Sequence, residues 1–224
     1  MSMPILYSFR RCPYAMRARL AIASANLTVE LREILLRDKA PAFLKVSPSA
    51  TVPCLQDGDT VLDESLDIMF WALKRHDPQG WLDMPAEGHD LITRADGPFK
   101  QALDRTKYDT RYPDCDPEEE RAKAHAFLHD LNNRLERTAY LFKPNPSVAD
   151  MAILPFVRQF AFIDKARFDG EDWPHLSRWL ETFLACDLFR SIMSKYPVWQ
   201  ADDTPVIFPA TLSHEAGLIN SAQP

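Results

Sequence analysis

Cys12 is the residue of this sequence best suited to chemistry. A short apolar run over residues 4–7 ends in polar residues, and Cys12 then stands directly before Pro13 and a segment with helix-like apolar spacing. Proline fits the first helical position because the amide it lacks would have no partner there, so Cys12 is the predicted N-cap. The free amides and dipole of that helix, with Arg10 and Arg11 nearby, favour a thiolate whose pKa falls from about 8.5 to about 3.5–7.5. The alternative is a buried cysteine that only packs.

Neither the remaining cysteines nor the histidines indicate a metal site. Cys54, Cys115 and Cys186 lie far apart from Cys12 and from one another, and no Cys-x-x-Cys pair exists, so neither a zinc cluster nor a dense disulfide framework is predicted. His125 and His129 have a metal-ligand spacing, but the glutamate of a His-Glu-x-x-His motif and a third ligand are missing. We therefore expect surface histidines, no bound metal and a cysteine that acts alone.

Composition and charge exclude several classes of function. The 224 residues carry a formal charge of −6 and a pI near 5.5, which gives no general attraction to nucleic acid or to an anionic membrane. No Gly-x-Gly-x-x-Gly or Gly-x-x-x-x-Gly-Lys loop is present to hold the phosphates of a nucleotide. The sequence has no apolar run of about 18 residues and begins without the apolar core of a signal peptide. These features predict a soluble cytoplasmic protein.

The first 77 residues alternate between strand-like and helix-like patterns. The order strand, helix, strand favours a parallel pair of strands, and Asp57-Gly58 between two short apolar runs indicates a hairpin. The predicted strands cover about 5–7, 28–34, 52–56 and 60–62, and the predicted helices about 13–25, 40–46 and 64–75.

After a linker predicted at residues 78–88, the pattern becomes entirely helical over residues 89–200. Asp116-Pro117 is a predicted helix start, and Ser147 with Asp150 is a predicted capping box. Pro155 predicts a bend within the helix that follows. The helices are expected at about 90–110, 116–142, from 147 onward, 173–185 and 187–196. The tail, residues 201–224, is rich in proline and small residues and is expected either to wrap the surface or to be disordered.

The segment Cys12-Pro13-Tyr14-Ala15, together with Arg17, resembles the active-site segment of glutaredoxins and of cysteine-type glutathione S-transferases, especially the omega class and its bacterial relatives. The order of elements extends this resemblance over most of the chain. It implies the glutathione S-transferase architecture, an α/β thioredoxin-like N-terminal domain followed by an all-α C-terminal domain. It also implies a homodimer.

The resemblance implies a set of residues that bind glutathione. Pro53 would follow a cis peptide bond, and Val52 would pair its backbone with the cysteinyl part of glutathione. Glu64 would bind the α-ammonium group, and Ser65 with the amides of the helix start would bind the α-carboxylate. Lys39 would meet the glycyl carboxylate, a role that Arg37 could also fill. Without the resemblance these residues are an ordinary trans proline, a helix cap and a solvated lysine.

Aromatic residues near Cys12 are candidates for lining the pocket of the second substrate. These candidates are Tyr7, Phe9, Tyr14 and Tyr108. Tyr7 resembles the tyrosine that activates the glutathione thiol in conjugating members of the family, but omega-like members have a tyrosine there too. We therefore expect Tyr7 to pack.

The resemblance implies a glutathione-dependent thiol transferase or reductase that acts on a mixed disulfide or on a small oxidised substrate of the dehydroascorbate type. Ala15 stands where dithiol glutaredoxins have a second cysteine, so a second glutathione would release Cys12. Two alternatives stay open. One is a conjugating transferase acting on small electrophiles, in which Cys12 or Tyr7 only stabilises the glutathione thiolate. The other is a non-enzymatic binding module that retains the fold.

Overall fold

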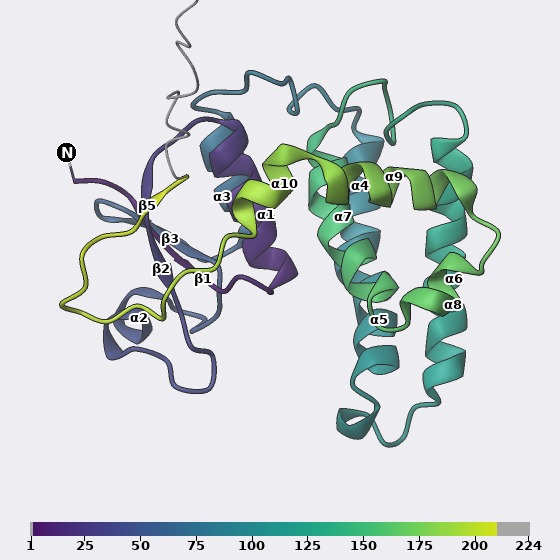
Figure 1. Ribbon diagram of the computed structural model, residues 1–224, viewed down its shortest axis with the longest axis horizontal. Helices are drawn as coiled ribbons and strands as arrows, with labels where there is room; N and C mark the ends of the chain where they lie inside the picture. Colours follow the sequence, from purple (N-terminus) through teal and green to yellow (C-terminus); the bar gives the residue numbers. More distant parts are fainter. Residues whose placement is uncertain (1, 210–224) are drawn as a thin grey trace, which may run out of the picture.

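The computed structural model describes residues 2–209, which form a mixed sheet with flanking helices beside an all-helical region (Figure 1). The sheet order is β4-β3-β1-β2-β5, in which β1 and β2 are parallel and the other neighbouring pairs are antiparallel. The strands are β1 (Ile5–Ser8), β2 (Val29–Glu33), β3 (Cys54–Asp57), β4 (Thr60–Leu62) and β5 (Ile207–Phe208).

Alternating side chains of the sheet supply two separate cores. Leu6 is opposite Leu31 on β2 and Leu55 on β3, and all three join the large core that includes residues of α1 (Pro13–Ser24) and α3 (Ser65–Leu73). The neighbouring pair Tyr7 and Cys54 belongs to a smaller cluster with Phe43 of α2 (Pro41–Val46). The period of two along a strand therefore places Cys54 and Tyr7 on the same face as α2.

The second half of the described chain is helical, and its predicted caps are confirmed. The Asp116 side chain accepts a hydrogen bond from the Glu118 amide at 2.8 Å, and Ser147 with Asp150 forms the capping box. Asp150 also accepts from Trp179 Nε1 at 3.1 Å. The helices are α4 (Glu87–Arg94), α5 (Lys100–Lys107), α6 (Pro117–Leu135), α7 (Val148–Ala161), α8 (Lys165–Asp169), α9 (Pro174–Ala185) and α10 (Asp187–Ile192), with a π-helical turn η1 (Ala95–Phe99) and a short 3₁₀ turn η2 (Asp109–Arg111).

Several predicted boundaries were wrong. The helix expected over 90–110 is divided by η1, which contains Pro98, a residue without an amide to donate. The helix expected to reach residue 142 ends at Leu135, and the one expected over 187–196 ends at Ile192. Two short elements, α8 and β5, were not predicted. Pro155 lies inside α7, as expected, and the bend predicted there stays a prediction.

Part of the tail adds an edge to the sheet. The Leu31 amide donates to the Val206 carbonyl at 2.8 Å, the Trp199 amide donates to the Glu33 carbonyl at 2.9 Å, and β5 pairs antiparallel with β2. The segment over residues 201–209 therefore wraps the surface, one of the two expected outcomes. The prediction for residues 210–224 lies outside the described residues.

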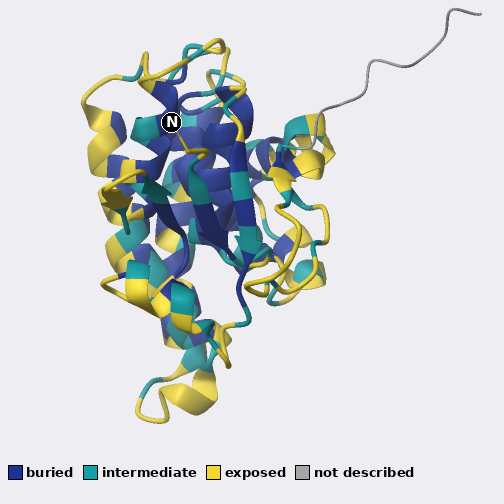
Figure 2. Cartoon of the chain, turned by 90° about the vertical axis from the view of Figure 1, so that its left-hand side faces the viewer, coloured by how far each residue is buried: buried dark blue, intermediate teal, exposed yellow. Residues whose placement is uncertain are grey.

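Arg17 joins the sheet region to the helical region. Its side chain is 1% exposed, donates from Nε to the Ala152 carbonyl of α7 at 2.7 Å, and pairs with Asp96 of η1 at 2.5 Å. Its guanidinium carbon also lies 4.5 Å from the centre of the Phe156 ring. Figure 2 shows the continuous buried interior along the sheet and the helices behind it. Among residues 2–209, no helix combines the length and the hydropathy needed to cross a membrane.

Candidate functional site

Cys12 is the N-cap residue of α1, as the sequence predicted, with Pro13 in the first helical position. The Cys12 amide donates to the Phe9 carbonyl at 3.0 Å, and the Cys12 carbonyl accepts from the Met16 amide at 2.9 Å, which fixes the turn before the helix. The thiol is half-buried, and Sγ lies 3.6 Å from the Val52 carbonyl oxygen, to which it donates. The sulfur is therefore at the helix start, facing the loop before β3.

The predicted low pKa of Cys12 was wrong. Burial raises the pKa of the Cys12 thiol, because the charged form loses contact with water. The backbone amides of Tyr14 and Ala15 lower the pKa, but their effect is smaller than that of burial, and Cys12 accepts no capping hydrogen bond. The sequence indicates a helix dipole at this position, whereas the burial that opposes it comes from the tertiary structure.

The cations that act on the sulfur are not the ones named from the sequence. Arg19 and Lys100 lower the pKa of Cys12 through their charge, while Arg11 is exposed and lies beside the Phe9 ring. Arg19 is fully buried, donates to Ser8 Oγ and to the Arg10 carbonyl, both at 2.6 Å, and burial lowers its own pKa to about 10. Arg19 could have been identified from the sequence, because it is a charged residue on the apolar face of the predicted first helix. No pattern in the sequence indicated that Lys100 lies near the sulfur.

The peptide bond between Val52 and Pro53 is cis, as the resemblance implied. Val52 is nearly buried and packs in the small cluster with Tyr7 and Phe43. Its carbonyl is the acceptor of the Cys12 thiol. The thiol and the loop before β3 thus meet although 40 residues separate them in the chain.

Glu64 and Ser65 start α3, the second helix whose N-terminus belongs to the candidate site. Glu64 is exposed and is the N-cap residue, but its side chain makes no capping hydrogen bond. Asp63 does not cap the helix either, because it accepts hydrogen bonds from Ser47 Oγ at 2.7 Å and the Ser49 amide at 2.6 Å. The first amides of α3 therefore remain available to an anion.

Ser65 is buried, and its hydroxyl oxygen accepts from Arg17 Nη1 at 3.4 Å. The hydroxyl can still donate its own proton to a ligand. Ser65 thereby connects the start of α3 to Arg17, the residue that joins the sheet region to the helical region.

Lys39 is half-buried at the rim of a mainly apolar cavity of about 760 Å³. The cavity lies between the loop after β2 and the segment from Val198 to Ala201, with Trp199 on one side. Arg37 is exposed and does not line the cavity. Of the two candidates for a carboxylate contact, Lys39 is thus the one beside a cavity.

Tyr7 is buried rather than directed into an open pocket. Its hydroxyl accepts from Arg32 Nη1 at 3.0 Å, and its ring packs 5.2 Å from Phe43 and 6.4 Å from Trp199. Burial raises its pKa, which favours the protonated phenol. Phe9 packs against the same small cluster. Neither Tyr7 nor Phe9 lines the cavity between α1 and the helical region.

A cavity of about 250 Å³ lies between α1 and the helical region. On the α1 side it is lined by Pro13 and Tyr14, the two residues that follow Cys12 in the sequence. Tyr14 and Tyr108, both predicted from the sequence, line it together, and Tyr14 also packs edge-on against Phe156 with the ring centres 4.8 Å apart. The complete lining is Pro13, Tyr14, Lys100, Asp104, Tyr108, Arg111, Tyr112 and Gln159.

The other cysteines and the histidines form no metal site within residues 2–209. Cys54 is buried, and burial with the nearby Asp63 raises its pKa to about 12. His125 is half-buried, with its ring centre 5.0 Å from that of Trp173, so its prediction as a surface residue was wrong. His129 is exposed. Cys186 caps α10, where its Sγ accepts from the Phe189 amide at 3.4 Å. Cys12 differs in that the two residues that follow it, Pro13 and Tyr14, line the cavity of about 250 Å³.

Comparison with known proteins identifies both regions. Residues 6–80 match the family model described as glutathione S-transferase, N-terminal domain, and residues 100–182 match the model described as glutathione S-transferase, C-terminal domain. The probable glutathione S-transferase parA of Nicotiana tabacum is 27% identical over 188 residues, covering 80% of this chain and 83% of that protein. Glutaredoxin 2 of Escherichia coli (strain K12) is 36% identical over 70 residues, covering 31% of this chain and 32% of that protein.

Solved structures share the fold. A glutathione transferase family member from Pseudomonas fluorescens, with two glutathione molecules bound, superimposes with a TM-score of 0.74 at 18% sequence identity. The superposition covers 85% of this chain and 92% of that one. The architecture expected from the sequence, a thioredoxin-like domain followed by a helical domain, is thus confirmed.

Proposed function

This chain belongs to the glutathione S-transferase family, and from that premise we propose that it is a glutathione-dependent thiol transferase or reductase that works through Cys12. Its substrate is a mixed disulfide of glutathione or a small oxidised compound of the dehydroascorbate type, and glutathione is the co-substrate. The omega-like, cysteine-type assignment is part of this proposal.

The observation that carries the proposal is the position of the Cys12 sulfur. It is half-buried at the start of α1, 3.6 Å from the carbonyl of Val52, the residue before a cis proline. An extended peptide that pairs with the Val52 backbone would bring its central side chain to this sulfur. The Pseudomonas fluorescens relative with two bound glutathione molecules and the glutaredoxin match support glutathione as that peptide.

The ends of a bound glutathione have complementary groups nearby. Glu64 would bind the α-ammonium group, while Ser65 and the free amides of α3 would bind the α-carboxylate. Lys39 would bind the glycyl carboxylate at the rim of the larger cavity. These assignments match charge to charge along the peptide.

The proposed reaction consists of two thiol–disulfide exchanges. The Cys12 thiol first loses its proton to solvent, and the thiolate attacks the glutathionyl sulfur of the mixed disulfide, forming a Cys12–glutathione disulfide as the second thiolate leaves and takes up a proton. A second glutathione thiolate then attacks the glutathionyl sulfur, giving oxidised glutathione and free Cys12. Glutathione is the reductant, and the charges of Arg19 and Lys100 stabilise the Cys12 thiolate in both steps.

The alternative function is conjugation of glutathione to a small electrophile, and one observation favours it. Because burial raises the pKa of Cys12, its protonated thiol is a hydrogen-bond donor that could stabilise the thiolate of bound glutathione. Tyr7 is less suited to this role because its side chain is buried in the small cluster with Phe43 and Val52.

Substitution of Cys12 separates the two functions. We expect Cys12→Ser to lower reduction of hydroxyethyl disulfide about a hundredfold or more, while conjugation of an aromatic halide is retained. Cys115→Ser, at a half-buried cysteine of the helical region, is the matched control and should leave both activities unchanged. Mass spectrometry of the wild-type protein after treatment with the mixed disulfide should find one glutathionyl group, on Cys12.

The outcomes of that experiment are distinct. Undiminished disulfide reduction in Cys12→Ser would overturn the proposal. If the wild type reduces no disulfide and Cys12→Ser loses conjugation, the result would support the conjugating transferase. Absence of both activities, combined with tight glutathione binding in calorimetry, would support the binding module.

We also propose a cytoplasmic homodimer, as the family resemblance implies. Light scattering of the purified chain tests the oligomeric state directly. A monomer at micromolar concentration would contradict it.

A further inference from the structure

The cavity of about 250 Å³ beside Cys12 is built mostly from charged and hydrogen-bonding side chains. One wall is Pro13 and Tyr14 at the start of α1, and the other comes from α5, η2 and α7. The second wall contributes Lys100, Arg111 and Gln159 in addition to tyrosines. A pocket that selects apolar electrophiles would instead be lined mainly by hydrophobic side chains.

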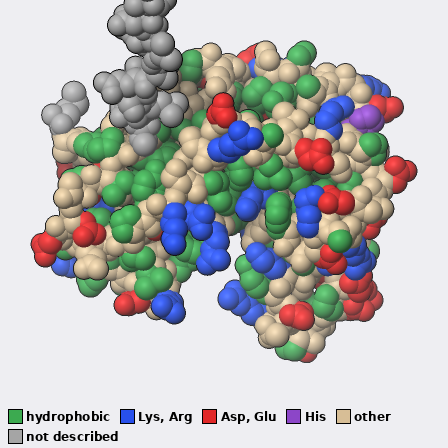
Figure 3. Space-filling view, in the orientation of Figure 1, with side chains coloured by type: hydrophobic (Ala, Val, Ile, Leu, Met, Phe, Trp, Pro, Cys, Tyr) green, Lys and Arg blue, Asp and Glu red, His purple; other side chains and the backbone are tan. Residues whose placement is uncertain are grey.

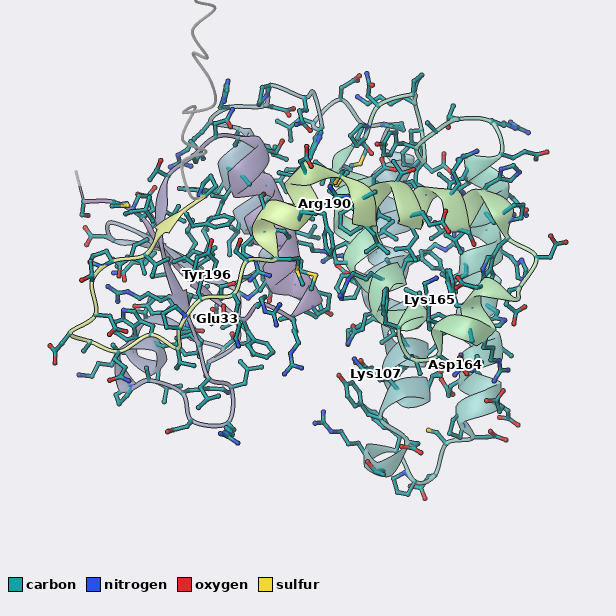
Figure 4. The ribbon with its side chains drawn as sticks, in the orientation of Figure 1. Glu33, Lys107, Asp164, Lys165, Arg190 and Tyr196 are labelled. Atoms are coloured by element: carbon teal, nitrogen blue, oxygen red, sulfur yellow. The ribbon has the colours of Figure 1, made fainter. Side chains whose placement is uncertain are left out.

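The charged residues that line this cavity carry a net positive charge. Within the described chain they are Lys100, Arg111 and Asp104, and the Asp104 carboxylate pairs with Lys100, so Arg111 supplies the excess charge. The Arg111 guanidinium carbon lies 4.7 Å from the centre of the Tyr108 ring, and the ammonium nitrogen of Lys107 lies 5.1 Å from it. In Figure 3 the surface is notched below, between the sheet region and the lower end of the helical region, with Lys and Arg side chains on both sides. Figure 4 labels Lys107 at that end of α5.

Hydrogen-bonding side chains complete the lining of this cavity, among them Tyr14, Tyr108 and Gln159. Tyr14 adds a donor, because burial and the nearby Asp96 raise its pKa to about 12 and keep the phenol protonated.

We propose that the second substrate, the group whose thiolate leaves when Cys12 takes the glutathionyl sulfur, is a small hydrophilic anion with a carboxylate. This inference rests on the proposed function and specifies its substrate class. Arg111 and Lys100 attract the carboxylate, and the protonated Tyr14 phenol can donate a hydrogen bond to it. An apolar aromatic group would cover these polar groups without pairing with them and is disfavoured.

Three mixed disulfides of glutathione test the proposal, because they differ only at the end of the leaving group. The leaving thiols are 3-mercaptopropionate, 2-mercaptoethanol and cysteamine, which end in a carboxylate, a hydroxyl and an ammonium group. Each kcat/KM is divided by the rate of uncatalysed exchange with free glutathione, since the three thiols differ as leaving groups. We expect the normalised values to fall in that order, with about a tenfold difference between the first and the last.

Arg111→Gln is the diagnostic variant, since Arg111 is exposed and its replacement leaves the core intact. It should reduce the preference for the carboxylate over the ammonium substrate about threefold. Arg137→Gln is the matched control and should leave the preference unchanged. Arg137 is exposed and follows the C-terminal end of α6, whereas Arg111 lies before the N-terminal end of that helix. Raising the salt concentration should also reduce the wild-type preference for the carboxylate over the ammonium substrate, because salt screens the charge of Arg111.

The results distinguish this inference from the function on which it rests. Turnover that depends on Cys12 but shows no normalised preference for the carboxylate would overturn the inference alone. A preference that Arg111→Gln and Arg137→Gln lower equally would also overturn it, because the cavity would then not be its source. Failure of Cys12 to turn over any of the three disulfides would overturn the proposed function as well.

Discussion

The two sides of the candidate site are built from different parts of the chain. On the sheet side, main-chain features position most of the groups: the N-termini of α1 and α3, which carry Cys12, Glu64 and Ser65, and the loop with the cis bond before Pro53. On the helical side, the cavity is formed by long side chains such as Lys100, Arg111 and Gln159. Main-chain groups are positioned by secondary structure itself, whereas the ends of long side chains depend on tertiary packing.

This difference matches the two substrates that the site would bind. The rigid sheet side suits a constant co-substrate, which the proposal identifies as glutathione. The helical side suits a variable substrate, because changes in a few long side chains alter its charge and shape without moving the backbone. Substitutions on each side should therefore have separable effects, except at the residue that contacts both.

Arg17 is that residue, and its replacement should have the largest effect. It pairs with Asp96 of η1 and also contacts Ser65 at the start of α3. We expect Arg17→Met to lower the free energy of unfolding by about 3 kcal/mol, because it leaves Asp96 and the Ala152 carbonyl without their buried partner. Urea unfolding followed by tryptophan fluorescence measures the change.

The control for Arg17→Met is Arg75→Met, which removes an exposed ion pair with Asp57. Its cost should stay below about 1 kcal/mol. Equal stability losses in the two variants would show that Arg17 does not connect the two sides.

Glu64→Gln should affect the sheet side alone. Removal of the charge opposite the α-ammonium group should weaken glutathione binding about tenfold. The maximal rate should change little, since Glu64 does not touch the sulfur. Calorimetric titration with glutathione measures the affinity, and Glu119→Gln, in the exposed first turn of α6, is the control. Equal affinities for the two variants would remove Glu64 from the binding site.

The sequence predicted the sheet side well because its signals are local. Proline after Cys12 marks the start of α1. Asp57-Gly58 marks the hairpin between β3 and β4, where Gly58 has the positive φ of 60° that such turns require. Glu64 and Ser65 stand at the start of α3, a helix that the apolar spacing of the sequence predicted. Each inference needed only a few neighbouring residues.

The sequence could not predict features that arise from distant segments. The thiolate at Cys12 was expected from the helix dipole, but burial by packed structure has the larger effect on the pKa. The two-residue strand β5 pairs with the edge of β2, through Val29 with Phe208 and Glu30 with Ile207, and no local pattern indicates a strand so far along the chain. Similarly, no local pattern directs Lys100 and Gln159 into one cavity.

Lys100→Gln tests whether the helical side acts on the sulfur, and its effect should be the smallest. Burial raises the pKa of Cys12, so the thiolate is the minor form at neutral pH and kcat/KM for a neutral mixed disulfide should rise as pH increases through that pKa. Loss of Lys100 removes a charge that lowers this pKa and frees its partner Asp104, so the profile should move to higher pH by about half a unit.

At pH 7 the expected loss in kcat/KM for Lys100→Gln is only about twofold, because a thiolate of higher pKa is scarcer but also a stronger nucleophile. At a pH above the pKa of the variant, the difference from the wild type should disappear or reverse. Lys123→Gln, which removes an exposed lysine paired with Glu120, should leave the profile unchanged. A profile that does not move in Lys100→Gln, or that moves to lower pH, would mean that the two sides of the site are electrostatically independent. A wild-type rate that is flat between about pH 6 and pH 8 would contradict the raised pKa of Cys12 itself.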